Sequence, residues 1–207
     1  ALRLEALRRM FIDVGYSDSK AQQQADCAFR VFHTARQQVT LFEHADSLLA
    51  SLNSRYSLAA LTNGNADVSI IGLDRYFDFA LTADDIGKQK PHPDMFLAAL
   101  EKANVNANEV IHIGDHPEQD IMGAHQAGLH TIWVNFDRAP WDDSSAQDYA
   151  SPPGKEANCL TEIPKLIGQI EGSLIKYAIL ERISHSQRIT ISEIKRTCQD
   201  QIRPVVI

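Results

Sequence analysis

A chain of 207 residues, 44% hydrophobic and 23% charged, has room for one domain with an appendage or for two small domains, and this composition excludes a disordered or fibrous protein. The net charge of −7 argues against a general nucleic-acid surface, and no apolar run approaches the roughly 18 residues that span a bilayer. The cysteines Cys27, Cys159 and Cys198 are odd in number and far apart, so they predict no disulfide framework and favour a reducing, cytoplasmic location.

The first forty residues predict two amphipathic helices. Apolar residues recur at helical spacing over residues 2–14, and Gly15 ends that segment. The Ser17-Asp18-Ser19 sequence offers an N-cap for a second helix over about residues 20–36. Because no helix start signal precedes the first segment, we expect the chain to begin partway through a domain.

After a third helix around residues 45–52, short apolar runs alternate with helical patterns. Runs typical of buried parallel strands occupy residues 58–61, 77–81, 110–113 and 130–134. Helices are expected over residues 66–73, 94–103 and 118–127, followed by a surface loop over 137–156, a last short strand at 158–160 and a closing helix over 163–170. This alternation predicts an α/β fold with a doubly wound parallel sheet, whose ligands bind at the carboxyl ends of the strands.

Thr62, Asn63 and Gly64 directly follow the first predicted strand. A hydroxyl group and backbone N–H groups in a turn that leaves a strand can bind an anion, so these residues are candidates for a phosphate site. The competing interpretation is that Thr62 merely caps the next helix.

Lys90 precedes Pro91 and Pro93, which stiffen the chain just before a predicted helix. An ammonium group held there can neutralise a phosphate or a nucleophilic carboxylate. The alternatives are that Lys90 is a solvated loop residue, or that Lys88 performs this role instead.

Asp115 and Asp120 follow the strand predicted at residues 110–113. Gly114 allows a tight turn there, and Asp120 lies about one helical turn further along. Two carboxylates beside a phosphate suit Mg²⁺, with one acid binding the metal and the other orienting a metal-bound water or holding Lys90. The competing interpretation is that Asp115 caps a helix and Asp120 is a surface acid.

In combination these motifs are far more specific than any one alone. The order T-N-G, then K-P-x-P-x-x-F, then G-D-x-x-x-x-D-x-x-G-A-x-x-A-G resembles the haloacid dehalogenase-like superfamily, most closely its small bacterial phosphatases of flavin mononucleotide and related sugar or pyrimidine phosphates. The resemblance implies catalytic roles for Thr62, Lys90 and Asp120, phosphate binding by Thr62, Asn63, Gly64 and Lys90, and metal binding by Asp115 and Asp120.

The same resemblance implies a domain organisation. Residues 1–40 correspond to part of a helical cap, and residues 41–170 correspond to a Rossmann-like core. Residues 171–207 lie outside the match and are expected to form a helical tail. We expect that tail, with two helix candidates after Gly172, to serve in docking or homodimer formation, unless it is foreign sequence from a shifted boundary.

One motif of the family is absent. Members open with a strand ending in D-x-D-x-T or D-x-D-x-V, whose first aspartate attacks phosphorus, and no such strand occurs in these 207 residues. In the family that strand lies at the centre of the sheet. We therefore expect the central first strand to be missing, either because about seventy N-terminal residues are absent or, less simply, because the C-terminal tail or a partner chain fills the gap.

The sequence thus predicts a Mg²⁺-dependent phosphatase that hydrolyses a small phosphomonoester through an aspartyl-phosphate. The chain as printed lacks the nucleophile and is predicted to be inactive alone. Three alternatives remain: a non-catalytic binding or interaction module of the same fold, a dehalogenase of the same superfamily, and a response-regulator receiver domain, whose acid pair would have to precede its threonine and lysine.

Overall fold

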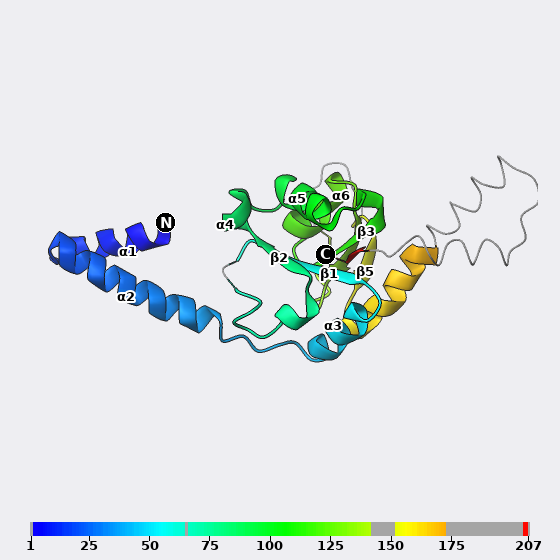
Figure 1. Ribbon diagram of the computed structural model, residues 1–207, viewed down its shortest axis with the longest axis horizontal. Coiled ribbons are helices and arrows are strands. Elements are labelled where there is room, and N and C mark those ends of the chain that lie inside the picture. Colours follow the sequence, from blue (N-terminus) through cyan, green and yellow to red (C-terminus); the bar gives the residue numbers. More distant parts are fainter. Residues whose placement is uncertain (1, 65, 142–151, 173–204, 207) are drawn as a thin grey trace, which may run out of the picture. The chain divides into compact units, whose positions relative to one another are not determined.

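The computed structural model describes residues 2–64, 66–141, 152–172 and 205–206. The chain forms two compact units, Ala1–Thr40 with Asn65–Leu73 and Leu41–Gly64 with Asp74–Ile207 (Figure 1). The expected tail helices lie outside the described residues. No helix in the described ranges is long and apolar enough to cross a bilayer.

The first unit contains the two expected helices, α1 (Leu2–Asp13) and α2 (Asp18–Arg36). Ser17 occupies the predicted N-cap position of α2, but its side chain makes no capping hydrogen bond. The small residues Ala21 and Ala25 are fully buried, which lets α1 and α2 pack closely. The apolar spacing therefore predicted this helix pair correctly.

The prediction of a helix over residues 66–73 is wrong, because the chain forms turns there. The Asp67 side chain accepts a hydrogen bond from the Ser69 backbone N–H at 2.8 Å, a local bond that competes with helix formation. Gly72 then adopts a left-handed conformation with φ of 78°. Polar and glycine residues override the weak helical pattern in this stretch.

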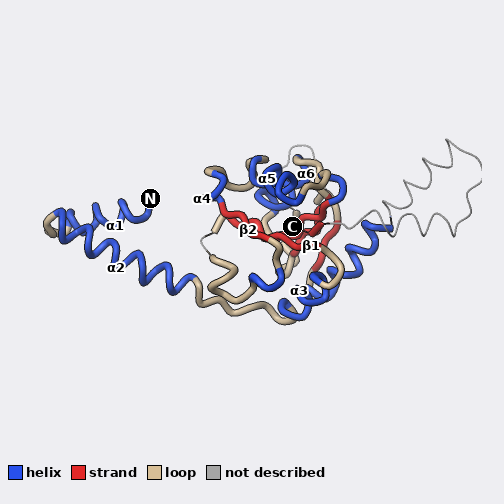
Figure 2. The backbone as a smooth tube through the Cα atoms, in the orientation of Figure 1, coloured by secondary structure: helices blue, strands red, loops and turns tan. Residues whose placement is uncertain are grey.

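The second unit is built on a parallel sheet, whose strands are red in Figure 2, and the strand order is β2-β1-β6-β3-β4-β5. The strands are β1 (Ser57–Thr62), β2 (Phe79–Thr82), β3 (Val110–Gly114), β4 (His130–Val134), β5 (Lys155–Ala157) and β6 (Val205–Val206). The prediction of a parallel α/β sheet is confirmed. The missing central strand is not confirmed, because β6 pairs with both β1 and β3 at the amino ends of those strands.

Two predicted strands are displaced along the chain. Strand β2 begins at Phe79 rather than at residue 77, because the Phe77 N–H bonds to Asp74 and so continues the helical turn η1 (Asp74–Tyr76). The last strand is β5 rather than residues 158–160. The Asn158 N–H donates to the Glu162 carboxylate instead, beside the turn η4 (Leu160–Glu162).

Helices cover both faces of the sheet (Figure 1). One face carries α3 (Ala45–Asn53) and the helical residues 163–172, packed in a cluster that includes Leu52, Leu58, Ile111 and Ile163. The other face carries α5 (Asp94–Ala103) and α6 (Gly123–Gln126), whose cluster includes Phe96 and Ala124. The remaining short helices are α4 (Ala83–Ile86), η2 (Ala107–Glu109) and η3 (Pro117–Met122), a π-helical turn that leads into α6.

Candidate active site at the strand ends

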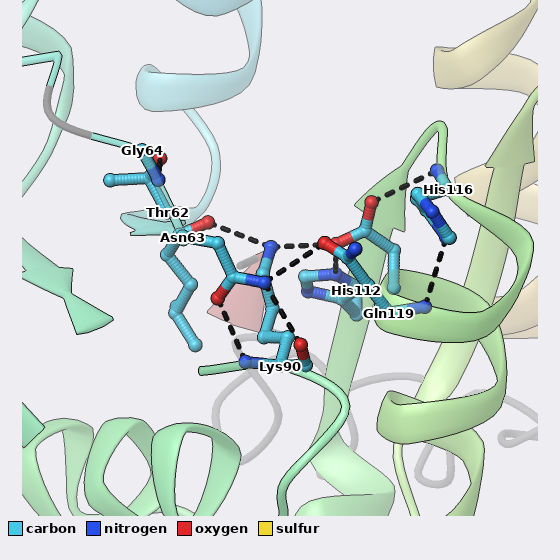
Figure 3. Close-up of polar contacts among 9 residues, drawn as sticks. Thr62, Asn63, Gly64, Lys90, His112, His116 and Gln119 are labelled. Carbon is cyan, nitrogen blue, oxygen red and sulfur yellow. Dashed lines mark hydrogen bonds and ion pairs between the residues drawn. The ribbon is translucent and has the colours of Figure 1, made fainter. Parts of the chain in front are cut away.

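Thr62 is the last residue of β1 and lies half-buried at the carboxyl edge of the sheet. Its hydroxyl oxygen accepts a hydrogen bond from the Gly64 backbone N–H at 2.9 Å (Figure 3). This bond orients the Thr62 side chain and uses one lone pair of its hydroxyl oxygen, which leaves the hydroxyl hydrogen unused. The hydroxyl hydrogen can therefore be donated to an anion.

Asn63 holds the lysine loop against the end of β1. Its Oδ1 accepts a hydrogen bond from the Lys90 backbone N–H at 2.8 Å, and its Nδ2 donates to the Lys90 carbonyl and to Gln119 Oε1, both at 2.9 Å (Figure 3). Both amide hydrogens are thus engaged. The geometry gives the Asn63 side chain a positioning role and leaves it no free donor for phosphate.

Lys90 is buried, and its ammonium group bonds both to the end of β1 and to Asp120 in η3. The Nζ atom donates to the Leu61 carbonyl at 2.9 Å and forms an ion pair with Asp120 Oδ1 at 2.6 Å. The side chains of Lys90 and Asp120 are only 9% and 8% exposed. This burial excludes the solvated-loop interpretation of Lys90 and the surface interpretation of Asp120, and Lys88 is exposed.

Asp120 accepts hydrogen bonds at both carboxylate oxygens. Besides Lys90, Oδ1 lies 3.2 Å from His112 Nε2, while Oδ2 accepts from the His116 backbone N–H at 3.0 Å. Burial acts to raise the pKa of Asp120, but the hydrogen bond from His112 and the charge of Lys90 outweigh it and hold the pKa below its ordinary range. Asp120 therefore remains a carboxylate that is held by three contacts.

Gly114 is needed at the end of β3 because Asp120 packs directly against it. A Cβ at this position would lie 2.4 Å from the Asp120 Cβ and Cγ atoms, far inside van der Waals contact. Only glycine lets the carboxylate reach the strand end. The sequence analysis expected this glycine to permit a tight turn, whereas the structure shows that it also makes room for the acid.

Replacing Gly114 with alanine is expected to destabilise the fold by about 1–3 kcal/mol, because either Asp120 or the strand must move. Gly168 is the matched control, since it is exposed, lies in a helix and has no neighbour within 4 Å of an added Cβ. Gly168→Ala is expected to stabilise the protein by about 0.5–1 kcal/mol. Urea unfolding measures both, and a Gly114→Ala variant as stable as the parent would contradict the packing argument.

Asp115 lies just past β3 and is exposed. Its backbone carbonyl accepts a hydrogen bond from the Trp133 indole at 3.0 Å, while no hydrogen bond or ion pair engages its carboxylate among the described residues. The described ranges contain no cluster of three or more His, Cys, Asp or Glu side chains that could hold a metal. A metal here would depend on Asp115, water and substrate oxygens, which is a set that suits Mg²⁺.

The candidate residues meet in one cavity of about 620 Å³ in the second unit. The six predicted site residues that line it are Thr62, Asn63, Gly64, Lys90, Asp115 and Asp120. His112 and Gln119 also line it, and the sequence analysis did not assign either to the site. The sequence did hold one signal for His112, which is a polar residue within a strand predicted to be buried. A buried imidazole requires a hydrogen-bond partner, so a polar neighbour could have been expected there.

Comparison with known proteins agrees with this geometry. A family model described as haloacid dehalogenase-like hydrolase matches residues 5–134. The 5-amino-6-(5-phospho-D-ribitylamino)uracil phosphatase YigB of Escherichia coli is 33% identical over 132 residues, which are 64% of this chain and 56% of that protein. The phosphoserine phosphatase of Thermus thermophilus is 30% identical over 152 residues, 70% of this chain and 59% of that protein. This chain thus spans little more than half the length of these relatives.

Solved structures share the fold. One described as a 2-haloacid dehalogenase from Pseudomonas syringae is 41% identical with a TM-score of 0.75, and the match covers 81% of this chain and 70% of that one. The putative hydrolase YfnB from Bacillus subtilis, solved bound to magnesium, is 23% identical with a TM-score of 0.55, covering 78% and 68%. The family predicted from the three motifs is therefore confirmed.

Proposed function

We propose that this chain, which belongs to the haloacid dehalogenase-like hydrolase family, provides the phosphate-binding and magnesium-binding part of a phosphatase that hydrolyses a small phosphorylated metabolite. The observation that carries the proposal is the position of the Lys90 ammonium group, bonded to the end of β1 and to the acid beyond the end of β3. Thr62 and Asp115 line the same cavity. Phosphatase names among the relatives support the substrate class.

Each side chain of the site has a separate role in binding a phosphoryl group. The Thr62 hydroxyl donates to one phosphoryl oxygen, and Lys90 offsets the negative charge that develops as the phosphorus is attacked. Asp120 holds Lys90 in place through their ion pair. Asp115, whose carboxylate is exposed and has no partner among the described residues, is the first candidate of the predicted acid pair to bind Mg²⁺. When bound, this ion supplies Lewis-acid stabilisation of the phosphoryl oxygens.

The nucleophile comes from outside the printed sequence. An aspartate carboxylate forms a bond to phosphorus as the bond from phosphorus to the substrate's ester oxygen breaks, and that oxygen takes a proton from water and leaves as the alcohol. Water then hydrolyses the aspartyl-phosphate and releases inorganic phosphate. Under this proposal residues 1–40 belong to a helical cap, residues 41–170 form the core, and residues 171–207 serve in docking.

The test uses the reading frame extended upstream of Ala1, with p-nitrophenyl phosphate as substrate. We expect hydrolysis that requires Mg²⁺ and stops with EDTA, no halide release from 2-chloropropionate, and no turnover by the printed chain alone. Halide release without Mg²⁺ would instead establish the dehalogenase that the Pseudomonas syringae structure's description favours. Equal turnover with and without Mg²⁺ would overturn the metal assignment.

A non-catalytic module is the second candidate, and the position of β6 between β1 and β3 favours it, because the C-terminal segment then lies where the catalytic strand would run. It predicts a native protein with an intact mass near 23.1 kDa. That mass, with cooperative unfolding and no turnover of any phosphate ester, would support the module over the enzyme.

A further inference from the structure

The backbone carbonyl of Asp115 is bonded to a tryptophan from the neighbouring strand. Trp133 lies in β4, where it is the parallel partner of Gly114 at the end of β3. From this position its indole Nε1–H donates a hydrogen bond to the Asp115 carbonyl oxygen at 3.0 Å. Trp133 is only 3% exposed, so little water can compete for the indole N–H.

The other edge of the same peptide group is bonded as well. The backbone N–H of His116, which shares a peptide plane with the Asp115 carbonyl, donates to Asp120 Oδ2 at 3.0 Å. The C=O and N–H groups of a trans peptide point in opposite directions from one rigid plane. Bonds at both edges therefore fix the orientation of that plane. We call the Asp115–His116 peptide, held between Trp133 and Asp120, the peptide clamp.

The peptide clamp controls the direction of the Asp115 side chain. On the amino side of Asp115, Gly114 is held by its pairing with β4, and on the carboxyl side the peptide plane is held by the clamp. The carboxylate itself is exposed and engages no hydrogen bond or ion pair among the described residues. Its backbone contacts are therefore what directs it into the cavity that it lines.

The indole of Trp133 is itself held by a second tryptophan. Trp141 packs edge to face against it, with ring centroids 5.3 Å apart and an interplanar angle of 76°. Asn135 folds the chain between the two rings, since its side chain both accepts from the Ala139 N–H and donates to the Ala139 carbonyl, each at 2.9 Å. The donor side of the peptide clamp is thus braced from a segment well beyond β3.

We propose that Trp133 is a positioning residue of the magnesium site and acts on Asp115 through the peptide clamp. This inference rests on the proposed function, in which the Asp115 carboxylate binds Mg²⁺. A carboxylate whose direction is already set loses less conformational freedom when it binds a ligand. Groups that orient a metal-binding side chain typically contribute about 10–100-fold to metal affinity. Trp133 would therefore raise the affinity for Mg²⁺ without contacting the ion.

The alternative is that the bond only satisfies the donor of a buried indole, which normally finds a hydrogen-bond partner. The two interpretations predict different measurements. If the bond is only structural, its loss lowers the stability of the fold and leaves the Mg²⁺ dissociation constant of the folded protein unchanged. If Trp133 positions Asp115, the dissociation constant rises.

Trp133→Phe, made in the upstream-extended protein, removes the indole N–H and retains an aromatic ring. We expect the Mg²⁺ dissociation constant, measured by isothermal titration calorimetry, to rise by at least about tenfold. Hydrolysis of p-nitrophenyl phosphate should then need more Mg²⁺. At saturating Mg²⁺ its rate should return to within about threefold of the parent, because the variant loses metal affinity rather than a contact to the reacting atoms.

Two further variants separate the bond from the packing around it. Trp141→Phe makes the same exchange in the adjoining ring and leaves the bond to Asp115 in place, so its Mg²⁺ dissociation constant should stay within about twofold of the parent. Trp133→benzothienylalanine replaces the indole N–H with sulfur and keeps the two-ring shape. It should weaken Mg²⁺ binding as Trp133→Phe does, and it tests the bond even where the smaller phenyl ring disturbs folding.

Nuclear magnetic resonance provides a measurement that is independent of activity. The indole N–H signal that disappears in Trp133→Phe belongs to Trp133. In the parent we expect this proton to exchange slowly with solvent, because it is buried and bonded. Its resonance should shift during a Mg²⁺ titration, with the midpoint found by calorimetry. In Asp115→Ala the same titration should leave the resonance unmoved.

The positioning role and the proposed function fail in different ways. Mg²⁺ dissociation constants of Trp133→Phe and Trp133→benzothienylalanine that both stay within about twofold of the parent would overturn the positioning role, even if both variants are less stable, and would leave the proposed function standing. Mg²⁺ binding and turnover that are unchanged in Asp115→Ala would contradict the metal assignment of the proposed function, and the positioning role with it.

Discussion

Replacing Lys90 with methionine is expected to lower the free energy of unfolding by about 3–5 kcal/mol, because it leaves the Asp120 carboxylate buried without its ion-pair partner. The side chains of both residues are less than 10% exposed, so water is a poor replacement for the lost ion pair. Urea unfolding at neutral pH measures the effect. Lys88→Met is the matched control, since Lys88 is exposed two residues away, and it should change stability by less than about 0.5 kcal/mol.

A double replacement separates the cost of an unpaired charge from the value of the pair. Lys90→Met combined with Asp120→Leu removes both charges, and we expect it to recover much of the stability lost in the single variant. If Lys90→Met alone costs less than about 1 kcal/mol, the ion pair does not hold the strand ends together.

The free energy of unfolding should depend on pH because the pKa of Asp120 is lowered in the folded state. A carboxylate whose folded-state pKa lies below its unfolded value of about 3.9 adds stability above that pH, and this stability is lost as the pH falls through the folded-state pKa. In Lys90→Met the pKa of Asp120 should rise. The stability difference between parent and variant should therefore narrow as the pH drops below about 4, and a constant difference would contradict the assignment.

Asp115→Ala is expected to lower the Mg²⁺-dependent phosphatase activity of the upstream-extended protein by on the order of 10²–10³-fold, because it removes the exposed carboxylate that we propose binds the metal. The change should cost little stability, since Asp115 is exposed and its carboxylate has no partner among the described residues. Steady-state kinetics across a Mg²⁺ titration measures the loss.

Glu118→Ala is the control for Asp115→Ala, because it removes a nearby exposed acid, in the turn η3, that lies outside the cavity lining. Its activity should stay within about twofold of the parent. On the printed chain, thermal unfolding supplies a second measurement. Mg²⁺ at ten times its dissociation constant should add about 1.4 kcal/mol to the parent and nothing to Asp115→Ala. Activity that survives Asp115→Ala would end the metal assignment.

Local pattern was sufficient to predict the framework of this protein. The apolar runs at 58–61 and 110–113 became β1 and β3, because continuous apolar segments bounded by turns are stable only where both faces of a sheet are covered. Parallel strands place their carboxyl ends at one edge. This rule places Thr62 and Asp115 at a shared site, and the resemblance of the motif order to the family adds Lys90 to it.

Only the tertiary structure decided how the polar groups are used. The sequence did not reveal that Asn63 bonds to the Lys90 backbone, or that Asp120 bonds to Lys90, His112 and a backbone N–H. Hydrogen bonds between residues far apart in sequence leave no periodic trace. Strand β6 lies within the segment expected to be a helical tail, and the sequence did not predict it, because strand pairing depends on which edges are open in space. Local sequence therefore determined most of the strands, whereas folding determined β6 and the pairing of all the strands.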